Sequence, residues 1–230
     1  MSVRAFAALL IGGQMTAVAA QAPTPAQALV ATDRVAYFET APSDVDRTIA
    51  ILKAYRQATQ KSPGIIRLEV LQQIGRPNLF AIAEKWSDGP SLQSHLASAN
   101  NKKMRDELQN ALISPFDERM LAPVTVQPTT GATTAQAIYV LTHADSVDRS
   151  GIVTTMLQNV ATAARRESGN LLFDVTVQPN RTNHFTLIEI WANQKAHESH
   201  IVGDDARKFR SAFGAVSGAL YDERLYRVIR

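Results

Sequence analysis

A glutamate, a tryptophan and a histidine occur at the same spacing in two parts of the chain. Residues 84–95 read EKWSDGPSLQSH and residues 189–200 read EIWANQKAHESH, so each stretch is Glu-x-Trp with a His nine residues after the Trp. An imidazole beside a carboxylate can move protons near neutral pH, and an indole offers a flat wall for an aromatic ring. The pattern predicts proton transfer on a flat, apolar small molecule.

The offset of 105 residues between the two stretches extends to other positions. Identical residues recur at this offset in the pairs Gly64 and Gly169, Arg76 and Arg181, Phe80 and Phe185, Arg105 and Arg210, and in the DER triplets at 117–119 and 222–224. So many identities at one spacing predict a duplicated unit. Nearer the N-terminus of each copy an offset of 102 aligns Tyr37 with Tyr139, which predicts about three extra residues in the second copy near the start of its first helix.

Each copy has the same expected order of strands and helices. In the first copy, β-branched and apolar runs predict four strands, at about 35–40, 65–71, 79–86 and 115–121. A helix is expected from Ser43 or Asp44 to Lys61, and a helical region broken near Asn100 is expected after Trp86. The order β-α-β-β-α-β is that of a ferredoxin-like unit, whose two helices cover one face of an antiparallel sheet.

The second face of each sheet explains why two copies are fused. An exposed apolar sheet is a liability in water, and packing one sheet on another covers it. We therefore expect an α+β protein in which two ferredoxin-like repeats pack sheet to sheet as an intramolecular dimeric α+β barrel. Residues 33–122 form repeat 1, 123–136 a Pro/Thr-rich linker and 137–230 repeat 2. This internal pseudo-dimer leaves further homo-oligomerisation open.

Strand alternation predicts which side chains meet. Along the third strand of each copy, Phe80, Glu84 and Trp86, and likewise Phe185, Glu189 and Trp191, share one face. A histidine about two turns into the next helix can fold back over that face. The candidate catalytic residues are therefore His95, His200, Glu84 and Glu189. The candidate substrate-binding residues are Trp86, Trp191, Phe80, Phe185 and, on the first strand, Tyr37 and Tyr139.

With its tandem β-α-β-β-α-β units and repeated Glu-x-Trp…His motif, the chain resembles the antibiotic biosynthesis monooxygenase (ABM) family, which includes quinol monooxygenases. The resemblance covers both halves, about three quarters of the chain. It implies cofactor-independent oxidation of an aromatic or quinol substrate by O₂, in pockets between sheet and helices that contain the histidines, tryptophans and glutamates. Members often carry a second His five residues after the first, where this chain has Asn100 and Asp205.

Other interpretations of the same residues stay open. Each glutamate can be a structural ion-pair partner, each tryptophan a hydrophobic cap and each histidine a helix cap. The protein would then be a non-catalytic small-molecule-binding or scaffold protein. A haem-binding or haem-degrading relative on the same scaffold is a further alternative, although such enzymes place an Asn on the first strand, which this chain lacks.

Composition narrows the partners and the compartment. The net charge of +3 without a Lys/Arg cluster gives little reason to bind nucleic acid, and the absence of cysteine excludes disulfides and thiolate metal sites. The histidines lack the spacing of a zinc helix, so we expect no metal. A basic start, a short apolar run and a small-residue stretch predict a signal peptide at residues 1–22 and a periplasmic or secreted protein without a membrane span.

Overall fold

The computed structural model describes residues 30, 32–128, 133–148 and 150–230. The first half consists of β1 (Asp33–Glu39), a 3-10 turn η1 (Pro42–Asp44), α1 (Val45–Thr59), β2 (Ile65–Gln73), β3 (Leu79–Trp86), α2 (Gly89–Leu96), α3 (Ala99–Leu108) and β4 (Asp117–Thr125). The second half consists of β5 (Ile138–Asp145), α4 (Ile152–Ala164), β6 (Asn170–Gln178), β7 (Arg181–Trp191), α5 (Gln194–Ile201), α6 (Asp204–Gly214) and β8 (Asp222–Val228). The predicted signal peptide lies outside the described residues.

The strands form one closed antiparallel barrel in the order β1-β3-β2-β8-β5-β7-β6-β4. The fourth strand of each half closes it, because β4 pairs with β1 of its own half and with β6 of the other, while β8 pairs with β5 and with β2. Closure removes unpaired sheet edges. This arrangement confirms the predicted intramolecular α+β barrel of two ferredoxin-like repeats.

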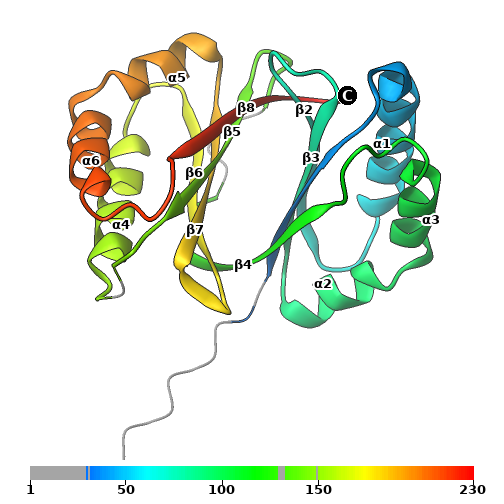
Figure 1. Cartoon of the computed structure of the whole chain (residues 1–230), viewed down its shortest axis with the longest axis horizontal. Helices are drawn as coiled ribbons and strands as arrows, with labels where there is room; N and C mark the ends of the chain where they lie inside the picture. The colour runs from blue at the N-terminus through cyan, green and yellow to red at the C-terminus, as the bar shows by residue number, and fades with distance from the viewer. Residues whose placement is uncertain (1–29, 31, 129–132, 149) are drawn as a thin grey trace, which may run out of the picture.

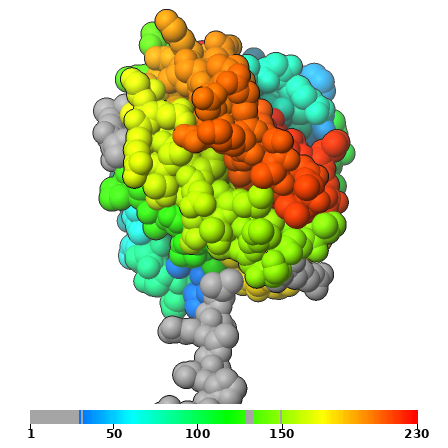
Figure 2. All heavy atoms as spheres, turned by 90° about the vertical axis from the view of Figure 1, so that its left-hand side faces the viewer, coloured from blue at the N-terminus to red at the C-terminus, as the bar shows by residue number. Residues whose placement is uncertain are grey.

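The helices lie outside the barrel, with α1, α2 and α3 on one side and α4, α5 and α6 on the other (Figure 1). From the side of the second half, α5 and α6 form a continuous orange to red surface beside the yellow-green α4 (Figure 2). Three apolar clusters result: one between each sheet half and its helices, and one inside the barrel. Among the described residues, no helix is long and apolar enough to cross a bilayer.

The helix boundaries follow local capping. Asp88 precedes α2 and its Oδ1 accepts a hydrogen bond from the Ser91 N–H at 2.7 Å, and Asn193 caps α5 in the same way through the Ala196 N–H at 3.0 Å. The predicted break in the helical region occurs at Ser98, two residues before the predicted position, where this serine caps α3. The helix α1 ends at Thr59, two residues before the predicted Lys61.

The repeated glycines Gly64 and Gly169 are required by the backbone. Both have a left-handed φ, +81° and +86°, which a residue with a Cβ rarely adopts. A Cβ at Gly64 would also lie 2.5 Å from the Ser91 hydroxyl oxygen, and one at Gly169 would lie 2.6 Å from the Ala196 Cβ. Each glycine therefore lets the start of a strand approach the helix that carries the site histidine.

The strand register corrects the alignment of the first strands. Arg34 pairs with Glu84 and Val140 pairs with Glu189, so β1 and β5 correspond at an offset of 106 instead of the predicted 102. Tyr37 consequently corresponds to His143, which pairs with Thr186 as Tyr37 pairs with Ala81. Val147, which the predicted offset of 102 aligns with Val45 at the start of α1, lies before α4. The alignment of Tyr37 with Tyr139 at an offset of 102 therefore does not reflect equivalent positions in the fold.

The predicted linker also begins later than expected. The strand β4 continues through Pro123 and Val124 to Thr125 and pairs there with β6 of the second half. The first residues of the segment 123–136 therefore help to close the barrel. The end of β4 lies beside β6 of the second half, so these residues extend β4 and pair with that strand. Residues 129–132 lie outside the described part of the chain.

Candidate functional site

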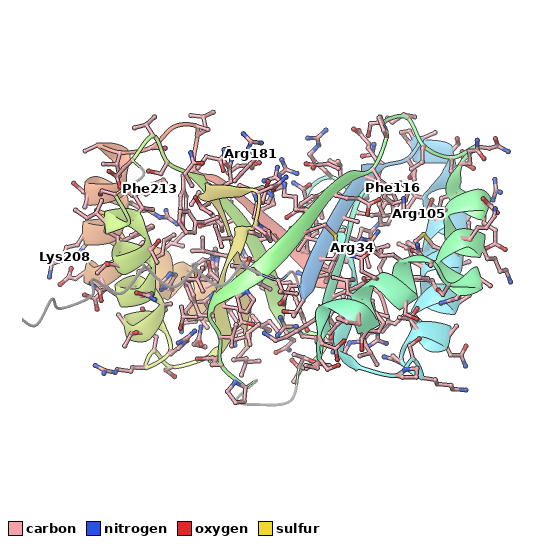
Figure 3. All side chains as sticks on the ribbon, turned by 90° about the horizontal axis from the view of Figure 1, so that it is seen from below. Arg34, Arg105, Phe116, Arg181, Lys208 and Phe213 are labelled. Atoms are coloured by element: carbon pink, nitrogen blue, oxygen red, sulfur yellow. The ribbon has the colours of Figure 1, made fainter. Side chains whose placement is uncertain are left out.

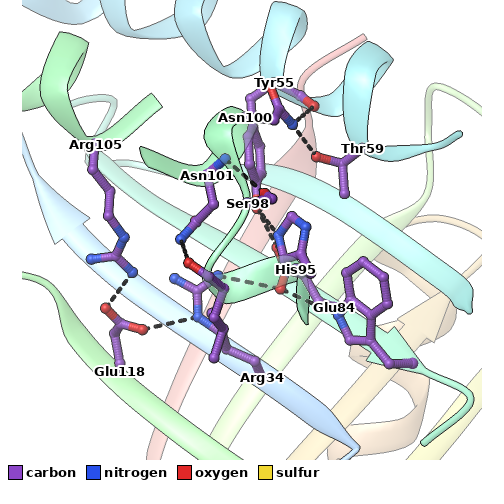
Figure 4. A network of polar contacts seen from close by, with 12 residues as sticks. Arg34, Tyr55, Thr59, Glu84, His95, Ser98, Asn100, Asn101, Arg105 and Glu118 are labelled. Carbon is purple, nitrogen blue, oxygen red and sulfur yellow. Dashed lines mark hydrogen bonds and ion pairs between the residues drawn. The ribbon is translucent and has the colours of Figure 1, made fainter. Parts of the chain in front are cut away.

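The N-terminal site is a buried polar network below α2 (Figure 4). The Arg34 Nη1 donates to Glu84 Oε2 at 3.2 Å, and the Tyr55 hydroxyl lies 2.5 Å from Glu84 Oε1 and 2.7 Å from His95 Nε2. Arg34 Nε also donates to Glu118 Oε2 at 3.0 Å, and Glu118 forms a second ion pair with Arg105 of α3. Glu84 Oε1 also lies 3.4 Å from His95 Nε2, and Trp86 Nε1 donates to Glu84 Oε2 at 3.4 Å. A charged carboxylate is thus held below the helix by contacts from β1, α1, α2 and its own strand.

These contacts keep Glu84 ionised although only 2% of it is exposed. Burial alone would raise the pKa of this carboxyl group, because a charge is poorly solvated in a protein interior. The hydrogen bond with His95, the positive charge of Arg34 and the Tyr55 hydroxyl outweigh burial and lower the pKa of Glu84 to about 2. Glu84 is therefore a fixed negative charge beside the imidazole.

The histidine and the tryptophan stack at the floor of a surface hollow. The rings of Trp86 and His95 have centroids 4.6 Å apart and an interplanar angle of 27°. The hollow above them has a volume of about 370 Å³ and is named here the N-terminal hollow. Its lining comprises Ser62, Pro63, Trp86, Pro90, Ser91, Ser94, His95 and Ser98. Glu84 lies below the rings and does not line this hollow, in contrast to the predicted pocket that all three residues would share.

The C-terminal site repeats the stack but lacks the charges. Trp191 and His200 stack at 4.7 Å and 27°, and Trp191 Nε1 donates to Glu189 Oε2 at 2.9 Å. At the position of Arg34 the second half has Val140, and at the position of Tyr55 it has Val160. Among the described residues Glu189 forms no ion pair, and Arg210, whose positive charge acts to lower the pKa of Glu189, is paired with Glu223.

The pKa of Glu189 shifts in the opposite direction from that of Glu84. Burial raises the pKa of Glu189 to about 8, the hydrogen bond from Trp191 opposes this, and the negative charge of Glu223 adds to it. At neutral pH Glu189 is thus mainly the uncharged acid. The same sequence motif therefore holds a carboxylate in one half and a carboxylic acid in the other.

His200 is bonded on the side opposite to His95. Its Nδ1 lies 3.0 and 3.1 Å from the two carboxylate oxygens of Glu167. Glu167 lines a hollow of about 720 Å³ that corresponds to the N-terminal hollow, in which Ser62 occupies the equivalent position. Beside it, His197 Nε2 lies 3.5 Å from Glu223 Oε1.

The remaining candidates are divided between two layers. Phe80 and Phe185 belong to the apolar clusters between sheet and helices, on the predicted face but surrounded by core residues. Figure 3 shows Phe116 and Arg105 in the corresponding layer of the first half and Phe213 in that of the second, outside the barrel. The phenylalanines therefore support the sites through packing.

Tyr37 and Tyr139, predicted as substrate-binding residues of the first strands, lie on the other face of the sheet. Both are in the cluster inside the barrel, on the opposite face of the sheet from the stacked rings, because the odd-numbered residues of β1 and of β5 point inward. Tyr139 donates to Glu69 Oε1 at 3.0 Å, and the Tyr37 ring contacts that of His143 at 5.2 Å. Neither can contact a substrate held over Trp86 or Trp191.

Sequence reasoning missed three residues that define the sites. Arg34 could have been found from the sequence. It is a charged residue at the start of a buried strand, and strand alternation places it on the sheet face that carries Glu84. A charge buried there needs a partner of opposite charge. Tyr55 lies on the buried face of α1 beside Leu52, and its hydroxyl gave no separate signal in the sequence. Glu167 had none, since it follows α4 at a position where the first half has Ser62.

No site in the described residues is arranged for a metal, since no group of three or more His, Asp or Glu side chains comes together as a set of ligands. The histidines are instead bonded to single carboxylates or hydroxyls. What the N-terminal site can do is accept a proton on an imidazole whose positive charge a neighbouring carboxylate stabilises, below a hollow with an aromatic floor.

Known structures share this tandem architecture. A Fusobacterium nucleatum protein proposed to be a monooxygenase is 13% identical, with a TM-score of 0.79 over 89% of this chain and 94% of the other. A Lactobacillus acidophilus protein of the same proposed class is 11% identical, with a TM-score of 0.72 over 86% and 93%. An anthrone oxidase-like protein is 11% identical, with a TM-score of 0.66 over 86% and 91%. At these identities the likeness shows the fold, and no curated protein matches the chain by sequence.

Both halves also match one sequence family, described as antibiotic biosynthesis monooxygenase, over residues 34–107 and 149–212. The matches contain Glu84, Trp86 and His95 in the first half and their counterparts in the second, and together they cover more than half of the chain. This membership supports a monooxygenase-like function. The chain is a tandem member of the antibiotic biosynthesis monooxygenase family.

Proposed function

We propose that this protein is a cofactor-independent monooxygenase that oxidises a quinol or another phenolic or polycyclic aromatic substrate with O₂. The observation that carries the proposal is the stacked pair of Trp86 and His95 at the floor of the N-terminal hollow, with the ionised Glu84 below it. The volume of about 370 Å³ suits a small flat molecule. An exported location, predicted from residues 1–22, is part of the proposal.

The residues supply proton transfer and the substrate supplies the electrons. His95 takes the phenolic proton, and the resulting imidazolium is stabilised by Glu84, as a carboxylate does for a catalytic imidazole in hydrolases. The phenolate gives one electron to O₂, and the phenoxyl radical and superoxide combine at a ring carbon. His95 returns its proton to the peroxide. Cleavage of the O–O bond with loss of the ring C–H proton then releases water and leaves a carbonyl group.

The overall balance defines what must be measured. The substrate loses two hydrogen atoms and gains one oxygen atom, and the second oxygen atom of O₂ leaves as water. We expect protein treated with a chelator to consume O₂ with members of a panel of quinols and polycyclic phenols, and ¹⁸O₂ to place one labelled atom in the product. His95→Gln should lower kcat by about 10²- to 10⁴-fold, the usual contribution of a general base.

Two results would reject the proposal. One is the absence of O₂ uptake across the panel by folded, chelator-treated protein. The other is turnover that does not change in His95→Gln. If O₂ is consumed but both labelled atoms stay in the product, the reaction is a dioxygenation and the mechanism above is wrong.

A further inference from the structure

The two site histidines use different ring nitrogens for their protein contacts. His95 is bonded through Nε2 to Tyr55, and His200 is bonded through Nδ1 to Glu167. Both rings stack on their tryptophans at the same angle and nearly the same distance. However, His95 lines its hollow, whereas His200 does not line the corresponding one. The two imidazoles therefore differ in their partners and in their position relative to the hollow.

The partners of His95 determine its tautomer. The Tyr55 hydroxyl has a single hydrogen, and the ionised Glu84 at 2.5 Å can only accept it. The contact of 2.7 Å between Tyr55 and His95 then requires the imidazole Nε2–H to donate to the tyrosine oxygen. The lone pair is left on Nδ1, which makes no hydrogen bond in the described part of the chain. His95 itself lines the N-terminal hollow, and Nδ1 is the ring nitrogen left to accept a proton from a substrate hydroxyl there.

The partners of His200 determine the opposite tautomer. A carboxylate accepts hydrogen bonds, so the contacts of 3.0 and 3.1 Å with Glu167 require the proton on Nδ1. This nitrogen cannot take a proton from a substrate, and Glu167 lies in the hollow where the substrate would approach. On the inner side no hydroxyl replaces that of Tyr55, because Val160 occupies its position.

We propose that only the N-terminal half performs the chemistry, with Tyr55 as a positioning residue that fixes the His95 tautomer, and that Glu167 blocks His200 in the C-terminal half. This inference rests on the monooxygenase proposed above and adds which half reacts and which residues decide it. Two differences between the halves decide which histidine can react. The first half has Tyr55 where the second has Val160, and Ser62 where the second has Glu167.

The tautomers can be measured without a substrate. In protein labelled with ¹⁵N at histidine, the shifts of Nδ1 and Nε2 and their couplings to the ring protons distinguish the two neutral tautomers, and His95→Gln and His200→Gln assign the signals. We expect the proton on Nε2 of His95 and on Nδ1 of His200. Tyr55→Phe removes the nearer of two acceptors and leaves Glu84 Oε1 at 3.4 Å from His95 Nε2, so we expect a smaller excess of the Nε2–H tautomer of His95. Glu167→Ser should turn His200 into a mixture of tautomers. A proton on Nδ1 of His95 in the unaltered protein overturns the inference.

Kinetics test the functional half of the inference. Tyr55→Phe keeps the ring in the core and removes only the hydroxyl, so we expect kcat to fall roughly 10- to 100-fold with KM changed less than about twofold. His200→Gln is the matched control, with both constants expected to stay within about twofold of the unaltered protein. Activity lost in His200→Gln and kept in His95→Gln would overturn the inference while leaving a monooxygenase. If neither the unaltered protein nor any variant turns over a substrate but both histidines show the expected tautomers, the proposed monooxygenase activity is rejected and the assignment of the tautomers stands.

Discussion

The substitution Glu189→Gln should make the protein more stable at neutral and alkaline pH. Glu189 is buried without a cation, and its pKa is raised from 4.5 to about 8. Between these two values the folded protein binds a proton that the unfolded chain has lost, so the free energy of unfolding falls as pH rises through this window. Glutamine carries no charge at any pH and its amide oxygen can still accept from Trp191 Nε1.

The magnitude follows from the width of the window. At pH 7, about 2.5 pH units above the ordinary pKa, the buried acid costs about 3 kcal/mol relative to an uncharged side chain. Near pH 4.5 the cost falls below about 0.5 kcal/mol, because the carboxyl is then protonated in the folded protein and half protonated in the unfolded chain. For a chain of this length about 3 kcal/mol corresponds to a rise in Tm of roughly 6–12 °C.

The assay is thermal and urea unfolding of both proteins across pH 4.5 to 8.5, with Glu84→Gln as the matched control. Glu84 has its pKa lowered to about 2, so its ionisation stabilises the fold above its ordinary pKa of 4.5, and this stabilisation is lost as pH falls toward 2. Glu84→Gln should therefore destabilise at pH 7 by about 3 kcal/mol, the opposite sign from the equivalent change in the second half. A pH-independent gain in Glu189→Gln, or a loss at pH 8, would refute the electrostatic reasoning.

Three further outcomes are expected. Arg34→Met, which leaves Glu84 buried without its cation, should lower the free energy of unfolding by about 3–5 kcal/mol in urea titrations. Gly64→Ala should destabilise more than Gly75→Ala, since both glycines have a φ of +81° but only the first places a Cβ against Ser91; equal losses would contradict the close-contact argument. Intact-mass measurement of exported protein should show cleavage after Ala20 or Ala22, and a full-length mass would contradict the predicted signal peptide.

The fold was predictable because its signals are local. Alternating apolar residues defined the strands, and the offset of 105 identified the duplicated unit. Gly64 and Gly169 mark the turns before a strand, and Asp88 and Asn193 mark the starts of α2 and α5. Closure of the barrel by β4 and β8 was not evident, because pairing between distant strands depends on the path of the chain and not on the composition of either strand.

The sites were predictable in position but not in charge. The stacks of Trp86 with His95 and of Trp191 with His200 follow from strand alternation and helix spacing. The ionisation of the two glutamates does not, because it depends on residues far apart in sequence. The predicted alignment of Tyr37 with Tyr139 hid the loss of the arginine in the second half. It used an offset of 102, whereas an offset of 106 is needed to match Arg34 with Val140, the residue that pairs with Glu189.

Fusing two copies in one chain permits this divergence. In a symmetric homodimer every substitution appears in both sites, so an arginine lost from one is lost from the other. Here both halves keep what the barrel needs: the glycine beside the helix, the capped turn, the indole over the carboxyl group, and the arginine and glutamate that join the last helix to the last strand. The charges around the buried carboxyl groups differ between the two halves. Folding alone does not require the buried Arg34 and Glu84 pair, since apolar residues such as Val140 of the second half fill the same space without desolvating a charge. The buried pair therefore favours a role for the N-terminal site beyond packing.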